Sequence, residues 1–244
     1  MNPMTAIPSP LRSRLDKLVA ELTPLVPGKL VALALYGGLA KGKALTETSD
    51  VNLLVVVADS SAETLQALTG PLVAARREAR AAPLIATSEE LAAMARAFPL
   101  KYEDIRRHHS LLLGIDPFSG GAPSEEDLRR DAHRGLLNLS MRLKKLFIER
   151  GADRALHLAV LEDILPGAIL AFKAALDPAS VATVRKREEV LEDAAKRAGT
   201  RADRLLLLLA LKKGAVWTPE AQPAELSAEL LATAEALRRS LERA

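Results

Sequence analysis

The stretch from Leu30 to Val57 constrains the fold of this chain more than any other. Its first seven residues, Leu30 to Tyr36, are apolar and predict a β-strand that ends at Gly37-Gly38. A second apolar run, Val51 to Val57, begins directly after Asp50 and predicts another strand. Because glycine has no side chain, a ligand can approach the backbone amides at the end of the first strand closely, which suits a phosphate group.

The start of the second strand carries two polar side chains, Asp50 and Asn52. Side chains alternate along a strand, so these two point to the same face, about 7 Å apart along the chain. Two acidic side chains at this spacing would hold Mg²⁺ beside a triphosphate bound at the glycine turn. Here one of the two is acidic and the other is an amide, so Asp50 is the stronger candidate metal ligand and Asn52 the weaker.

Taken together, these features resemble the signature of the DNA polymerase beta-like nucleotidyltransferase superfamily. That signature is a Gly-Gly or Gly-Ser pair followed by Asp-x-Asp on the next strand. In this chain Gly37-Gly38 is followed, after eleven residues, by Asp50-Val51-Asn52-Leu53. The similarity covers 28 residues, from the first strand to the end of the second, and is fairly specific because order, spacing and context agree.

The resemblance implies a role for each residue of the motif. The Gly37-Gly38 pair, with Lys41 or Lys43, would bind a nucleoside triphosphate, and Asp50 would bridge two Mg²⁺ ions shared by position 52. In the family's chemistry these ions, about 3.5 to 4 Å apart, steady the attacking and leaving oxygens while an acceptor hydroxyl attacks the α-phosphate. Asn52 offers an oxygen without a charge, so this departure from the family pattern implies weakened or lost catalysis.

The segment FPLKYEDIRRHHSLLLG, residues 98–114, extends the resemblance to about residue 118. Bacterial members of the superfamily carry Phe-Pro, an acidic strand and Leu-x-Gly at this point, which predicts a strand around Leu100 to Asp104. Lys101 aligns with the family's third acidic residue and is a second departure. Glu103 or Asp104 would then supply the third, catalytic carboxylate; equally, both fit the charges of a solvated edge.

Four basic residues, Arg106-Arg107-His108-His109, follow directly. Adjacent histidines in a strand point to opposite faces and cannot easily chelate one ion together, so this run does not predict a metal site. A contact from one of the arginines to a phosphate or to a partner is the alternative that stays open.

The rest of the first half reads as helices and one more strand. A helical pattern runs from Pro10 to Pro27-Gly28, and Ser60 or Ser61 caps a second helix that runs to about Arg80. We expect Gly70-Pro71 to kink or split that second helix. Residues 83–87 suit a third strand, and a helix from Ser88 ends before Phe98-Pro99.

Beyond the linker-like stretch 119–123, no strand pattern is present. Five helices are predicted, the second with a break at Pro166-Gly167: 124–150, 153–176, 183–198, 201–213 and 224–243. We therefore expect an α+β protein, in which a nucleotidyltransferase-like mixed sheet flanked by helices (residues 1–122) is followed by an all-α helical bundle (residues 123–244). In small bacterial members with this order of domains, such as those resembling aminoglycoside nucleotidyltransferases, the bundle closes over the acceptor site or mediates dimerisation, so the resemblance leaves a homodimer open.

Composition narrows the partners. The chain has 244 residues with 34 basic against 31 acidic side chains, a net charge of +3, so no global field points to nucleic acid. Cysteine is absent, which excludes disulfides and thiolate metal sites and fits a reducing compartment. The first ten residues do not form a signal peptide, and the longest apolar run, Leu205 to Leu211, is too short for a membrane span. We expect a cytoplasmic protein without a membrane partner.

Two functional hypotheses follow. In the first, the chain is a nucleotidyltransferase-fold protein with weakened or lost catalysis that binds a nucleotide or a partner. In the second, it is an active Mg²⁺-dependent nucleotidyltransferase that moves a nucleoside monophosphate from a nucleoside triphosphate to a hydroxyl of a small molecule or a protein. Intact Gly37-Gly38 and Asp50 favour the second hypothesis, while Asn52 and Lys101 favour the first.

Overall fold

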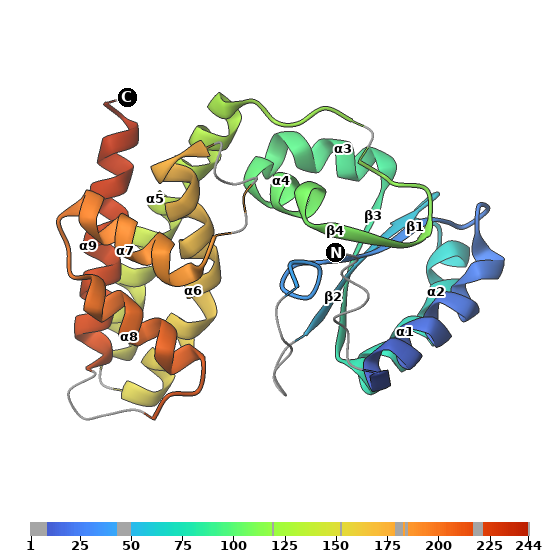
Figure 1. Ribbon diagram of the computed structural model, residues 1–244, viewed down its shortest axis with the longest axis horizontal. Helices are drawn as coiled ribbons and strands as arrows, with labels where there is room; N and C mark the ends of the chain where they lie inside the picture. The colour runs from blue at the N-terminus through green and yellow to red at the C-terminus, as the bar shows by residue number, and fades with distance from the viewer. Residues whose placement is uncertain are drawn as a thin grey trace. The chain divides into compact units, whose positions relative to one another are not determined.

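The computed structural model describes residues 9–42, 50–118, 120–151, 153–178, 183, 185–216 and 222–243. The chain divides into two compact units, Met1–Ala122 and Pro123–Ala244 (Figure 1). In the described residues the first unit contains a mixed sheet with helices on both faces, and the second contains helices without a strand. The predicted α+β fold class is confirmed.

The sheet has four strands in the order β3-β2-β1-β4. The central strand β1 (Leu30–Tyr36) pairs antiparallel with both β2 (Val51–Val57) and β4 (His109–Gly114). Strand β2 in turn pairs parallel with β3 (Ala81–Thr87), residue 51 opposite residue 81. The two strands of the glycine motif therefore lie side by side in the middle of the sheet, as the sequence predicts.

Each face of the sheet is covered by its own helices (Figure 1). On one face α1 (Ser9–Leu22), the short 3-10 turn η2 (Thr23–Leu25) and α2 (Ala62–Ala79) pack on the odd-numbered side chains of β2 and, after the irregularity between Leu30 and Ala32, of β1. On the other face α3 (Ser88–Ala97) and α4 (Pro99–Arg107) pack on the even-numbered ones of the same stretches. Burial on both sides explains why β1 and β2 are continuous apolar runs instead of alternating patterns.

Helix α2 runs without interruption past Gly70-Pro71, so it is not split there. Its N-terminus is stabilised by Ser61, whose hydroxyl accepts a hydrogen bond from the amide of Thr64. Pro71 lies in the third turn of the helix and removes one backbone N–H donor. The remaining backbone hydrogen bonds and the buried side chains of α2 outweigh that loss. The helix ends at Arg80, which adopts a left-handed conformation with φ of 53° and leads directly into β3.

The strand predicted around Leu100 to Asp104 is wrong, because those residues form α4. Pro99 occupies the first turn, where a missing N–H costs nothing, and starts the helix. The buried positions include Pro99, Tyr102 and Ile105, spaced by three, which is the period of a helix face. The last strand of the sheet begins only at His109 and contains the leucine run 111–113.

The second unit is a bundle formed by five helices in its described residues: α5 (Glu125–Arg150), α6 (Arg154–Leu176), α7 (Arg187–Ala198), α8 (Ala202–Lys212) and α9 (Pro223–Leu241). Helix α6 contacts all four others and lies at the centre of the bundle. It continues through Pro166-Gly167, so the predicted break is wrong. The apolar core of the bundle shares no residue with the two core clusters of the sheet.

Helix α6 is also long and apolar enough, by length and composition, to cross a membrane, and it is the one such helix in the described part of the chain. Ten of its residues are buried, and its apolar side chains contribute to the core of the bundle. A helix surrounded by others is expected to be apolar on most of its circumference. We therefore interpret α6 as a core helix of the bundle.

Candidate functional site

The glycine turn and Asn52 are in direct contact. Gly37 has a φ of +76°, a conformation that favours glycine, and its carbonyl oxygen accepts a hydrogen bond from the amide of Lys41 at 3.1 Å. A Cβ added to Gly37 would lie 2.9 Å from the side-chain nitrogen of Asn52. The amide of Asn52 thus lies against the turn, on the sheet face that α3 and α4 cover. A side chain larger than that of glycine at position 37 would collide with this amide.

Asp50 lies one residue before β2 and is exposed. Strands β2 and β3 run parallel with Val51 opposite Ala81, so the residues that precede them, Asp50 and Arg80, are neighbours. The Asp50 carboxylate lies 3.4 Å from an Arg80 guanidinium nitrogen. Ion pairs of this exposure contribute little to stability. Arg80 nevertheless affects metal binding, because a cation bound at Asp50 would be repelled by the nearby guanidinium group.

Lys41 and Asp104 form the closest ion pair of the site. The Lys41 ammonium donates to both carboxylate oxygens of Asp104, at 2.5 and 2.8 Å, and both side chains are about four-fifths buried (18% and 19% exposed). His108 adds a ring nitrogen 3.4 Å from the same carboxylate. Helix α4 therefore places Asp104 at the glycine turn, but with its charge already matched by a lysine. Lys43 lies outside the described residues.

Glu103 is buried, and its partners are two arginines of the same helix, α4. Its carboxylate accepts hydrogen bonds from Arg106, at 2.7 and 2.8 Å, and from Arg107 at 2.7 Å. Burial raises the pKa of Glu103, but the two arginines outweigh it and hold the pKa below its ordinary value. Both arginines are thus engaged by Glu103, while Lys101, aligned with the family's acid, is exposed. Glu103 stays ionised and anchors α4, a structural role.

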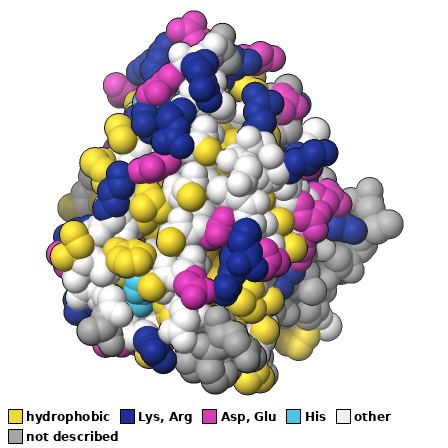
Figure 2. Space-filling view, turned by 90° about the vertical axis from the view of Figure 1, so that its left-hand side faces the viewer, with side chains coloured by type: hydrophobic (Ala, Val, Ile, Leu, Met, Phe, Trp, Pro, Cys, Tyr) yellow, Lys and Arg dark blue, Asp and Glu magenta, His cyan; other side chains and the backbone are white. Residues whose placement is uncertain are grey.

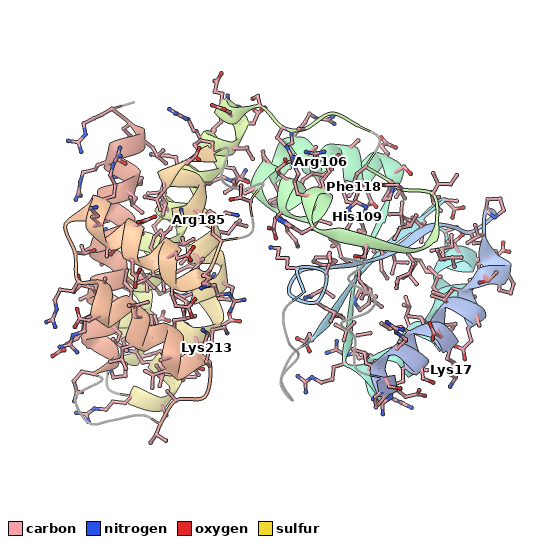
Figure 3. The ribbon with its side chains drawn as sticks, in the orientation of Figure 1. Lys17, Arg106, His109, Phe118, Arg185 and Lys213 are labelled. Atoms are coloured by element: carbon pink, nitrogen blue, oxygen red, sulfur yellow. The ribbon has the colours of Figure 1, made fainter. Side chains whose placement is uncertain are left out.

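The two histidines have separate partners. His108 faces Asp104, whereas His109 lies 3.4 Å from Asp116 and against the ring of Phe118, with ring centroids 4.7 Å apart (Figure 3). Phe118 also meets Tyr102 of α4 edge to face at 5.5 Å. This aromatic contact ties the segment after β4 to α4, which holds the helix over the sheet.

The two-metal arrangement does not fit the residues that the structure describes. None of the groups of His, Asp and Glu side chains in those ranges has three members placed to hold a metal ion. Asp50, Asp104 and Glu103 each contact a basic side chain, and Asn52 brings no charge. The described residues can instead present backbone amides at Gly37-Gly38 and a lysine to an anion.

Sequence reasoning missed the basic partners of the acids. Arg80 is the clearest case, since its position next to Asp50 depends on the parallel pairing of β2 with β3. The pairing of Lys41 with Asp104 likewise depends on α4 being a helix. A helical reading of the segment after Pro99, from its three-residue spacing of apolar side chains, would have been the available signal.

Comparison with known proteins supports the fold. No protein-family model and no curated protein matches the sequence. Among solved structures, the chain is similar to the crystal structure of spectinomycin adenyltransferase AAD(9) from Enterococcus faecialis with ATP and spectinomycin. The TM-score is 0.61 at 11% identity, over 91% of this chain and 98% of that chain. At this identity the likeness concerns the fold: the chain has a nucleotidyltransferase fold followed by a helical domain.

Proposed function

We propose that this protein binds a nucleoside triphosphate at the Gly37-Gly38 turn and that its capacity for nucleotidyl transfer is weakened or lost. The observation that carries the proposal is the contact between the Asn52 amide and Gly37. Asn52 is uncharged where the resemblance calls for the second metal-binding carboxylate, and its amide lies against the turn that we propose as the phosphate site. The fold and the glycine turn support binding; the missing charge argues against efficient transfer.

The neighbouring charges point the same way. Asp104 and Glu103 are each neutralised by basic side chains, so neither replaces the missing acid. If the loss weakens transition-state stabilisation by about 3 to 5 kcal/mol, the rate falls by roughly 10² to 10⁴. Binding is affected less, because backbone amides and Lys41 recognise phosphate without a protein-held metal pair.

Calorimetric titration of MgATP and MgGTP tests the proposal on three proteins: the natural chain, Asn52→Asp and Asp50→Asn. We expect the natural chain to bind a nucleotide and Asn52→Asp to bind it more tightly with Mg²⁺ than without, because a second negative charge then joins Asp50. Two close carboxylates repel, so Asn52→Asp should also lower the melting temperature slightly in the absence of Mg²⁺. No nucleotide binding in any of the three proteins would contradict the proposal.

A second candidate is the active enzyme, which the structural neighbour favours. The adenyltransferase structure holds ATP and spectinomycin, a nucleotide and a small-molecule acceptor, and Asp50 is retained here. Incubation with α-labelled ATP, Mg²⁺ and spectinomycin or related hydroxyl compounds would detect transfer of the labelled nucleotide. Transfer that Asp50→Asn abolishes would favour this candidate over the first.

The proposed nucleotide ligand also suggests where the protein acts and with which partners. A protein without cysteine that uses nucleoside triphosphates fits the cytoplasm, and we propose that it acts there without a membrane or nucleic-acid partner. A homodimer through the bundle is the assembly we propose to look for. Light scattering coupled to size-exclusion chromatography would give the mass in solution directly.

A further inference from the structure

A second concave feature lies in the helical bundle. It is a cavity of about 410 Å³ between α7 and α9, lined by Arg197, Ala198, Ala236, Arg239, Ser240 and Arg243. We call it the arginine hollow. Its lining comes from the end of α7, the end of α9 and Arg243 just beyond α9, segments about 40 residues apart in the sequence, so its shape depends on the packing of the bundle. Its volume falls in the range of about 300 to 1,000 Å³ that is usual for sites of small ligands.

The charge of the arginine hollow is one-sided. None of the described residues that line it is acidic, and three of the six are arginines. Arg239 lies in the last turn of α9, and Arg243 lies two residues beyond the end of that helix, so both bring positive charge to the same end of the bundle. Glu235 lies 3.8 Å from Arg239, but it also makes the shorter contact of 2.7 Å with Lys144. Three exposed arginines therefore line one hollow, and Arg239 has a long contact to an acid that binds Lys144 more closely.

Helix ends account for part of this arrangement. Arg197 and Arg239 lie in the last turns of α7 and α9, where positive side chains interact favourably with the helix dipole. That effect is equally available to side chains that point away from each other. Arg238, in the same turn of α9, does so and pairs with Glu242. The dipole therefore does not explain why the other arginines line one cavity.

We propose that the arginine hollow binds a compact phosphate anion with several charges, such as pyrophosphate or the polyphosphate chain of a small molecule. The planar guanidinium group bonds phosphate oxygens in pairs, so three groups around one cavity can hold two adjacent phosphates. An anion in the hollow would also offset the positive charge that the three arginines bring to its lining. This site lies within the second unit and does not depend on the proposed nucleotide site.

The surrounding surface argues for a compact anion over a nucleic acid. A long nucleic acid needs a continuous track of positive charge. On the bundle side shown in Figure 2, basic and acidic side chains are intermixed instead. Glu192 and Asp193 lie on α7, Glu235 lies on α9, and Glu242 follows the end of α9, so acidic side chains occur on the same segments as the hollow. Phosphates of an extended chain would meet these carboxylates, whereas a short anion would not.

The test is calorimetric titration of sodium pyrophosphate into the full chain at low ionic strength. The variant that removes the site is the double substitution Arg239→Gln and Arg243→Gln. The matched control is Arg238→Gln, which removes an arginine from the same turn of α9 but outside the hollow. Because pyrophosphate could also reach the glycine turn, the titrations are repeated on Lys41→Ala, with circular dichroism to verify that every variant is folded.

We expect Lys41→Ala to retain the binding of pyrophosphate at the arginine hollow. The double substitution should lower that affinity about tenfold or more, both in the natural chain and in the Lys41→Ala background. Arg238→Gln should stay within about twofold of the natural chain. Equal binding by the double variant and the natural chain, equal losses in the double variant and Arg238→Gln, or no binding to the natural chain would each overturn the proposal. So would a single-stranded 20-mer RNA that binds through the same arginines more tightly than pyrophosphate.

Discussion

At the scale of single residues, the acidic side chains of the candidate site already form ion pairs with basic ones. Lys41, the described lysine nearest the glycine turn, donates both its short hydrogen bonds to Asp104. A phosphate that binds Lys41 has to compete with that carboxylate for the ammonium group. The sequence suggested the lysine and the acid as separate participants, one for the nucleotide and one for catalysis. Their pairing is a tertiary contact, which no local pattern in the sequence encodes.

Asp104→Asn should therefore raise the affinity for ATP. Removing the negative charge releases Lys41 from a partly buried ion pair whose competition we take as about 1 kcal/mol, equivalent to about fivefold in the dissociation constant. Titration of ATP into the variant and the natural chain measures the difference. Asp116→Asn, which removes an acid that meets His109 instead, is the matched control and should leave the affinity unchanged. A weaker affinity in Asp104→Asn would mean that Asp104 itself supports nucleotide binding.

Glu103→Gln should destabilise the protein and flatten its acid sensitivity. Glutamine leaves Arg106 and Arg107 without their buried countercharge, at about 2 kcal/mol. The folded-state pKa of Glu103 lies below its ordinary value, so its contribution to stability is present above about pH 4.5 and is lost as the pH falls through the folded pKa. Urea unfolding of both proteins between pH 3 and pH 7 gives the comparison. If the two curves stayed parallel down to pH 3, the arginine contacts would not govern the pKa.

At the scale of elements, buried strands were predictable and the α4 to β4 segment was not. Strands β1 and β2 are continuous apolar runs bounded by glycine and polar residues, a pattern that leaves few alternatives. The segment after Pro99 is short and mixes apolar with charged side chains, so strand and helix periods both fit parts of it. Packing of Tyr102 and Ile105 against the sheet decides for the helix. Since β4 starts ten residues after Pro99, the resemblance placed the strand too early.

Two glycines in the first unit should respond in opposite ways to alanine. Gly70 lies inside α2, and a Cβ there would meet no atom within 4 Å, so Gly70→Ala should stabilise the protein by about 0.5 to 1 kcal/mol through helix propensity. Gly37→Ala should destabilise by about 1 to 3 kcal/mol, because of its positive φ and its contact with Asn52. Thermal unfolding of the two variants measures both effects. Equal effects of the two substitutions would contradict the geometry of the glycine turn.

At the scale of the whole molecule, the sequence predicted two regions of different architecture, and the described residues form three core clusters. Two of them belong to the sheet and its helices, and the third belongs to the bundle alone. That predicted division rested on the composition of the linker-like stretch and on the absence of strand patterns beyond it. The arginine hollow could not be predicted, because it joins residues of α7 and α9 that come together only when the bundle packs.

We expect residues 123–244, expressed alone, to fold as a helical bundle. Their core cluster contains residues of all five helices and none from the sheet, so the apolar surface they bury does not depend on the first unit. Far-ultraviolet circular dichroism and cooperative urea unfolding test this. A non-cooperative transition would show that the bundle needs the first unit to fold.

The pairing of Lys41 with Asp104 has a further consequence for how binding responds to salt. Phosphate recognition by a lysine is ordinarily weakened as added ions screen the attraction. Here added ions also weaken the competing contact between Lys41 and Asp104. Binding of a phosphate exchanges that ion pair for a new one, so the number of ionic contacts made by Lys41 does not increase. The two effects oppose each other, so affinity at this site should vary little with ionic strength, whereas anion binding by the exposed arginines of the bundle should fall steeply.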